Sequence, residues 1–148
     1  MSKREIVPFQ TTVRVRDTCL CLHAQRAARA LARRFDDVLR PVGLNNGQFS
    51  LMMSLNRPEP ARMGEVATLL AMDRTTLTAA LKPLTRRDLV EILIDPKDKR
   101  SRRLVLTDAG RALLAEALPI WEKTHAEIDK LLGDADAQRL RDNLVALS

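Results

Sequence analysis

The sequence predicts a mainly helical fold with one small β-hairpin, on the strength of three observations. Apolar residues recur at helical spacing along most of the 148 residues. Two short helical stretches, at about 62–70 and 73–87, are separated only by a tight turn. Two strand candidates, at 89–94 and 102–106, flank a polar turn. This order of elements is typical of a helix-turn-helix followed by a β-hairpin.

The N-terminal part predicts an arm and two helices. Residues 1–16 are expected to form an extended arm, and a long helix is expected to begin with Asp17 as its N-cap and to end near Gly43. Asn45, followed three residues later by Gln48, is typical of a capping box and predicts the start of the next helix. The apolar stripe of the long helix consists of Leu20, Ala24, Ala27, Ala28, Leu31, Phe35, Val38 and Leu39.

The C-terminal part predicts two more helices. Thr107 and Asp108 are expected to start a long helix that Pro119 kinks and Gly133 ends. Asp134 is expected to cap a last helix. The apolar residues expected to lie on the buried faces of these helices are Leu113, Leu114, Ala117, Leu118, Trp121, Ile128, Leu131, Leu140, Leu144 and Leu147.

The second helix of the close pair has an apolar inner side and a polar outer side. Two helices joined by a tight turn must pack closely, which explains the small or apolar residues Val66, Ala67, Leu70, Leu77, Ala80 and Leu81. The outer side presents side chains that suit base edges and phosphates in a major groove, mostly in the N-terminal half of the helix. These candidate DNA-binding residues are Arg74, Thr75, Thr76, Thr78 and Lys82.

The turn of the hairpin is strongly cationic. Within residues 95–103 it carries a net charge of +3, and a thin ribbon with an arginine at its tip suits the narrow, electronegative minor groove. Asp98 is expected to pair with Arg100 and fix its direction. The further DNA-binding candidates in the hairpin are Lys97, Asp98, Lys99, Arg100, Arg102 and Arg103.

Charge is unevenly distributed along the chain. The whole sequence has a net charge of +6, but residues 107–148 alone are at −3, so the positive charge lies before residue 104, as expected for a protein that approaches a polyanion with one face. We find no secretory signal and no stretch of about 20 apolar residues that could span a membrane. A cytoplasmic protein with reduced thiols is therefore expected.

The order of elements resembles the multiple-antibiotic-resistance regulator (MarR) family of winged helix-turn-helix transcriptional regulators, over about residues 17–146. The most specific stretch is residues 95–110, which contains Asp95-Pro96-Lys97-Asp98-Lys99-Arg100-Ser101 and is similar to the hairpin, or wing, and helix-entry signature of that family. Residues 69–78 resemble its recognition-helix region, and residues 43–49 resemble its entry to the second helix.

The resemblance implies a single domain over 1–148 that works as a homodimer. Residues 17–56 and 107–147 would supply the helices of an intertwined dimerisation region, and residues 62–106 the winged helix-turn-helix. Family members bind pseudo-palindromic double-stranded operator DNA, usually as repressors, and are released by small molecules or oxidants. Two departures from the family pattern are visible: Asp88 stands where glycine is common, and Pro83 lies inside the recognition helix.

Cys19, Cys21 and His23 allow three interpretations. Both thiols can be structural, since free cysteine is often buried. Cys21 can be an oxidant sensor, although the tyrosines of the family's peroxide sensors are missing. Cys19 and His23 share a helix face at a spacing that can chelate a metal. An intrahelical disulfide between Cys19 and Cys21 is not expected, because residues two apart point to different faces.

A ligand cleft is expected where the helical region meets the DNA-binding lobe. The residues that would line it, or else belong to the core, are Phe35, Phe49, Met52, Met53 and Trp121.

An enzyme is not expected, since His23 and His125 are far apart and no phosphate-loop, zinc-protease or hydrolase motif is present. No cofactor is expected either. The alternatives to a DNA-binding repressor are a winged-helix protein-interaction module and a thiol-based redox sensor without a classical ligand response.

Overall fold

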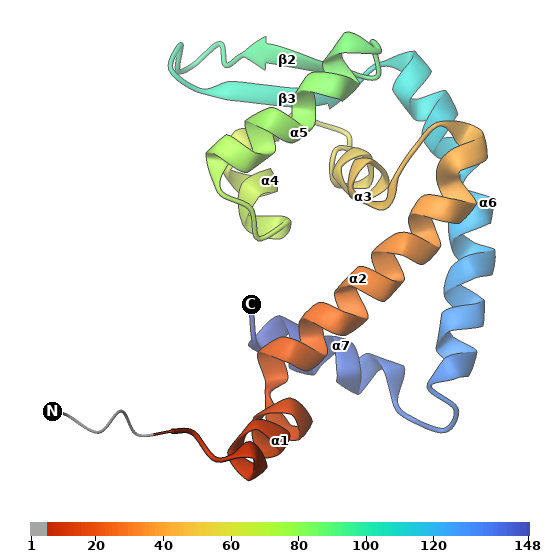
Figure 1. Ribbon diagram of the computed structural model, residues 1–148. Helices are drawn as coiled ribbons and strands as arrows, with labels where there is room; N and C mark the ends of the chain where they lie inside the picture. The colour runs from red at the N-terminus through yellow and green to blue at the C-terminus, as the bar shows by residue number, and fades with distance from the viewer. Residues whose placement is uncertain (1–5) are drawn as a thin grey trace, which may run out of the picture. The chain divides into compact units, whose positions relative to one another are not determined.

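A computed structural model describes residues 6–148, and the chain divides into two compact units after Arg34. The expected fold class is confirmed: the chain is mainly helical with a small antiparallel sheet (Figure 1). None of the helices in the described part of the chain is long and apolar enough to cross a membrane.

The first unit corrects the prediction for the N-terminus. Residues 9–18 form a helix, α1 (Phe9–Thr18), instead of an extended arm, and Pro8 precedes it with an extended backbone that suits a helix start. Residues 1–5 of the predicted arm lie outside the described residues. The long helix α2 (Leu20–Leu39) begins after Cys19, whose ψ of 111° interrupts the helical run, so Asp17 is not its N-cap.

The second unit begins with the end of α2 and a short 3-10 helix, η1 (Arg40–Val42). Gly43 follows with φ 73°, a left-handed conformation that glycine adopts without strain. The predicted capping box is confirmed: the Asn45 side chain accepts from the Gln48 N–H, and the Gln48 side chain accepts from the Asn45 N–H, at the start of α3 (Asn46–Ser54).

The helix-turn-helix consists of α4 (Met63–Leu69) and α5 (Arg74–Arg86). Ala71 turns the chain between them with φ 52°. The buried side chains include Val66 and Ala67 on α4 and Leu77 and Leu81 on α5, as the pattern of small and apolar residues predicts. Pro83 lies inside α5, which continues through it to Arg86.

Three antiparallel strands follow the order β1-β3-β2. The predicted hairpin is confirmed as β2 (Val90–Ile94) and β3 (Arg102–Leu106), with Ile92 opposite Leu104. The two-residue strand β1 (Ala61–Arg62) pairs with the other edge of β3 and was not predicted. It comes directly before α4, so the sheet joins the hairpin to the start of the helix-turn-helix.

The C-terminal helices are α6 (Asp108–Leu131), which continues through Pro119, and α7 (Ala137–Ala146). The N-cap of α6 is Thr107, as predicted, and its hydroxyl accepts from the Gly110 N–H. Gly133, with φ 59°, lies in the turn between the helices. The cap of α7 is Asp136 and not the predicted Asp134, since the Asp136 carboxylate accepts from the Arg139 N–H.

The junction between α5, the hairpin and α6 is tightly packed. Asp88 turns the chain out of α5 with φ 61°, a left-handed conformation that few residues other than glycine, asparagine and aspartate adopt. The Leu89 carbonyl then accepts from the Thr107 N–H at 3.1 Å. A Cβ on Gly110 would overlap this carbonyl oxygen, so no other residue fits there without moving the backbone.

We expect Gly110→Ala to lower the free energy of unfolding by about 1–3 kcal/mol, because the added methyl group meets rigid backbone instead of a side chain that can move. Chemical denaturation at a fixed protein concentration measures this. Gly47→Ala in α3 is the matched control, since its Cβ would have only an ordinary 3.6 Å contact. Equal stability of the two variants would contradict the packing at the junction.

Candidate nucleic-acid interface

The exposed face of α5 carries the residues that the sequence assigned to DNA. Arg74, Thr75, Thr76 and Thr78 are all exposed on its first two turns, and Lys82 follows one turn later. Asp73 caps the helix: its carboxylate accepts from the Thr76 N–H at 2.7 Å, and this hydrogen bond lowers the pKa of Asp73. The face therefore presents hydroxyl and cationic groups from a helix whose first turn is fixed.

The turn of the hairpin is held by Asp98, but in a different way from the one predicted. Its carboxylate accepts from the backbone N–H of Arg100 at 3.0 Å and from the hydroxyl of Ser101 at 3.3 Å. The expected ion pair with the Arg100 guanidinium is absent among residues 6–148. Local backbone donors lie closer to Asp98 than the long, exposed arginine side chain, which remains available to a ligand.

Asp95 and Arg103 form an ion pair at the base of the hairpin. Asp95 is buried, with 7 % of its side chain exposed, and it accepts from Arg103 Nε at 2.9 Å and from the Lys97 N–H at 2.9 Å. The Lys97 hydrogen bond, followed by Arg103, lowers the pKa of this carboxyl. Arg103 also donates to the carbonyl of Pro60, which precedes β1. Arg103, predicted to bind DNA, is therefore directed into the protein.

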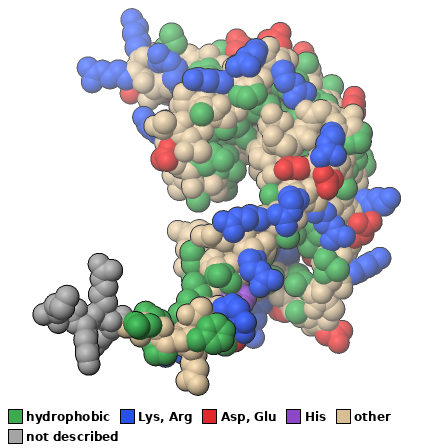
Figure 2. All heavy atoms as spheres, viewed as in Figure 1, with side chains coloured by type: hydrophobic (Ala, Val, Ile, Leu, Met, Phe, Trp, Pro, Cys, Tyr) green, Lys and Arg blue, Asp and Glu red, His purple; other side chains and the backbone are tan. Residues whose placement is uncertain are grey.

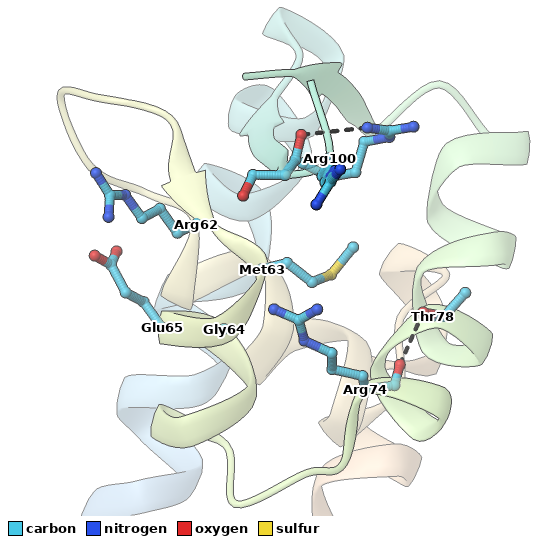
Figure 3. A pocket seen from close by; sticks show the side chains of 9 residues that line it. Arg62, Met63, Gly64, Glu65, Arg74, Thr78 and Arg100 are labelled. Atoms are coloured by element: carbon cyan, nitrogen blue, oxygen red, sulfur yellow. Dashed lines mark hydrogen bonds between the residues drawn. The ribbon is translucent and has the colours of Figure 1, made fainter. Parts of the chain in front are cut away.

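An arginine-lined groove lies between α4, α5 and the hairpin (Figure 3). We call it the arginine groove, and its volume is about 460 Å³. Among the predicted DNA-binding residues it brings together Arg74, Thr78, Arg100 and Arg102, whereas Thr75, Thr76, Lys82, Lys97 and Lys99 are exposed outside it. The residues that line the groove are Arg62, Met63, Gly64, Glu65, Arg74, Thr78, Arg100, Ser101 and Arg102.

Sequence reasoning missed Arg62 and the anchoring role of Asp95. Arg62 lies on the exposed side of β1, a strand too short to leave a periodic pattern.

Cationic side chains gather around the hairpin turn on the face shown in Figure 2, at its upper left.

Cys19, Cys21 and His23 lie in the first unit. Cys19 is half-buried and Cys21 is exposed, and both are free thiols. Cys19 directly precedes α2, and its carbonyl oxygen accepts from the His23 N–H at 3.1 Å and lies 2.7 Å from His23 Nδ1. Within residues 6–148 no three His, Cys, Asp or Glu side chains form a group that could hold a metal ion.

Three of the predicted cleft residues line one small apolar cavity in the second unit. Phe49, Met53 and Trp121 border a cavity of about 380 Å³, together with Ser50, Ser54, Leu69 and Leu70. The rings of Phe49 and Trp121 are stacked, with centroids 6.2 Å apart. The other two are elsewhere: Met52 is fully buried in the core, and Phe35 is partly buried against that core.

Two contacts connect the end of α2 with the end of α5. Asp36 accepts from the backbone and side-chain N–H groups of Asn46, at 2.8 and 2.7 Å, and these bonds lower its pKa. Arg87, directly after α5, donates to the Gly43 carbonyl at 2.7 Å. The loop between η1 and α3 is therefore bonded on both sides.

Comparisons with known proteins agree with this architecture. The family model "MarR family" matches residues 44–101. The transcriptional regulator MosR of M. tuberculosis, in a crystal structure with DNA, is 37% identical, with a TM-score of 0.79 over 87% of this chain and 92% of that one. The transcriptional repressor CouR, bound to a 23-mer DNA duplex, is 31% identical, with a TM-score of 0.71 over 90% and 92%.

A more distant relative is the HTH-type transcriptional regulator BilQ of Clostridioides difficile (strain CD3). It is 26% identical over 106 residues, which are 72% of each chain.

Proposed function

Because the chain belongs to the MarR family of transcriptional regulators, we propose that it is a homodimeric repressor that binds a pseudo-palindromic site in double-stranded DNA. It is a transcription regulator and not an enzyme. It would act in the cytoplasm, where such DNA is accessible. The observation that carries the proposal is that the exposed face of α5 and the cationic hairpin turn border one groove.

We propose a different task for each of these two elements. α5 is long enough to lie in a major groove and presents Thr75 and Thr76 from its first turn. The hairpin ends in a turn with Arg100 unpaired and exposed, which suits the negative potential of a minor groove. A protein-interaction module would need neither the cationic turn nor the threonine-rich face.

A homodimer is supported by apolar side chains that the single chain leaves exposed on its terminal helices. Leu20 is 68% exposed on α2, and Leu131 at the end of α6 is 71% exposed. Others on α7 and just after it are Leu140, Leu144, Val145 and Leu147. We propose that residues 17–56 and 107–147 bury these groups against a second copy, so that two winged helix-turn-helix lobes (62–106) bind half-sites about one helical turn apart.

We expect selection from a random duplex pool to yield a pseudo-palindromic site. Arg100→Ala should weaken binding tenfold or more on the selected site and on unrelated DNA, because the wing contact carries little sequence information. Thr76→Ala should instead change which bases are preferred. Titration at several salt concentrations measures both effects. A protein that binds all duplexes weakly, with no preferred site, would favour the interaction module.

The cavity beside Trp121 is the site we propose for a lipophilic or phenolic effector. Its walls are mostly apolar, Phe49 and Trp121 offer aromatic faces, and the Ser50 hydroxyl can orient a polar group. The Ser54 hydroxyl donates to the Leu51 carbonyl at 2.6 Å, so it can only accept a hydrogen bond from a ligand. Leu69, which borders the cavity, is 70% exposed, so the cavity is open to solvent on the side of Leu69.

Trp121 is the single tryptophan of the chain and there is no tyrosine, so intrinsic fluorescence reports on this cavity. We expect a phenolic carboxylate such as 4-hydroxycinnamate to quench it and to release DNA. Leu69→Glu should weaken the quenching, because it adds a negative charge at the rim. Ile94→Glu, equally an exposed aliphatic residue but outside the cavity, is the control. Equal quenching of both variants would contradict the cavity as the site.

The oxidant alternative rests on Cys21, an exposed free thiol whose Sγ accepts from Gln25 Nε2 at 3.1 Å. If it senses oxidants, hydrogen peroxide should release the wild-type protein from DNA, and Cys21→Ser should abolish this release. Cys19→Ser tests the neighbouring thiol in parallel. An oxidant response that survives in the Cys21→Ser variant would exclude Cys21 as the sensor.

A further inference from the structure

The arginine groove differs in chemistry from the exposed face of α5. Four of its lining residues are arginines, contributed by β1, α5 and the hairpin. Its one carboxylate, Glu65, is already paired with Arg57, with Nη2 and Oε2 3.0 Å apart. Within the described residues no carboxylate lies within 4.0 Å of the guanidinium groups of Arg62, Arg74 or Arg100. The groove therefore has an uncompensated positive charge.

Arg74 is directed into this groove. Its Nη2 atom is 3.7 Å from the position that a Cβ would occupy on Gly64, so the side chain lies across the first turn of α4. Figure 3 shows Arg74 reaching into the space from α5 and Arg100 entering it from the hairpin. The backbone carbonyl of Arg74 accepts from the Thr78 hydroxyl at 2.8 Å. The Arg74 side chain therefore lies in the groove, whereas Thr75 and Thr76 are exposed outside it.

We propose that the arginine groove binds a phosphate of the DNA backbone, and that Arg74 contacts this phosphate instead of reading a base. The inference rests on the proposed DNA binding. With α5 in a major groove and the hairpin in the neighbouring minor groove, the strand that separates the two grooves passes over the surface between these elements. That surface is the arginine groove, so a phosphate and not a base edge meets it.

Guanidinium groups suit this ligand. Arginine donates two parallel hydrogen bonds to a phosphate in a fixed geometry, and the interaction releases counterions from the DNA. Arg74 comes from α5 and Arg100 from the hairpin, so a phosphate bound by Arg74 would lie beside the Arg100 side chain proposed for the minor groove. Arg102 takes a lesser part, because its guanidinium also donates to the carbonyls of Lys99 and Ser101.

The test measures the salt dependence of binding for Arg74→Gln on the selected site and on unrelated duplex DNA. We expect about a tenfold loss on both at low salt and an unchanged preferred sequence. The slope of log K against log salt should be smaller in magnitude by about 1.8, which is about 0.9 for each of the two Arg74 side chains of the proposed homodimer. Arg74→Lys should restore the slope. Arg40→Gln, exposed and outside the groove, removes the same charge and should leave the slope nearly unchanged.

A neutral methylphosphonate at single positions of the site locates the contact. At one position it should weaken the wild-type protein but not Arg74→Gln. A changed base preference with an unchanged slope would overturn the proposal and make Arg74 a base contact. Full affinity of Arg74→Gln would also overturn it. If the protein is not a sequence-specific DNA-binding regulator, the wild-type protein shows no preferred site. This outcome is distinguishable from a failure of the Arg74 contact, which is measured on a site that the wild-type protein does prefer.

Discussion

The orientation of the recognition helix relative to the hairpin depends on one backbone carbonyl, that of Leu89. It accepts from the Thr107 N–H, and Gly110 packs against it without a side chain. The Thr107 hydroxyl donates to the preceding carbonyl, of Asp88, at 2.6 Å. The end of α5, both strands of the hairpin and the start of α6 meet there. Two DNA-binding elements can fit neighbouring grooves only if such a junction holds them at a fixed angle.

The ion pair of Asp95 and Arg103 provides a second fixed point, at the base of the hairpin. A buried carboxylate without partners would cost free energy, but this one accepts hydrogen bonds from Lys97 and Arg103. Through the Pro60 carbonyl, Arg103 also connects the hairpin to the segment before β1. One arginine is thereby withdrawn from the surface, and the hairpin turn presents the remaining cations from an anchored base.

Local signals explain what the sequence predicted. The capping box at Asn45, the cap at Thr107 and the two strands of the hairpin depend on residues close in sequence, and all are confirmed. The missed features depend on distant partners or very short elements. Sequence spacing cannot tell which of five neighbouring cations pairs with Asp95, nor show that Arg74 lies against Gly64 on another helix. Strand β1 has only two residues and no period to detect.

The loop between η1 and α3 is hydrogen-bonded both to the end of α2 and to the residue that follows α5. Asp36, near the end of α2, is bonded to Asn46, and Arg87, just after α5, is bonded to Gly43. Since only a few residues separate Gly43 from Asn46, and a capping box fixes α3 directly after them, the loop cannot absorb a shift of α2 by bending freely. A displacement of the end of α2 would therefore reach the end of α5 through the Arg87 contact. Release from DNA would then need only a small rotation of the recognition helix. The proposed effector cavity is bordered by α3, by Trp121 of α6 and by Leu69 and Leu70 at the end of α4, so it adjoins the helix-turn-helix.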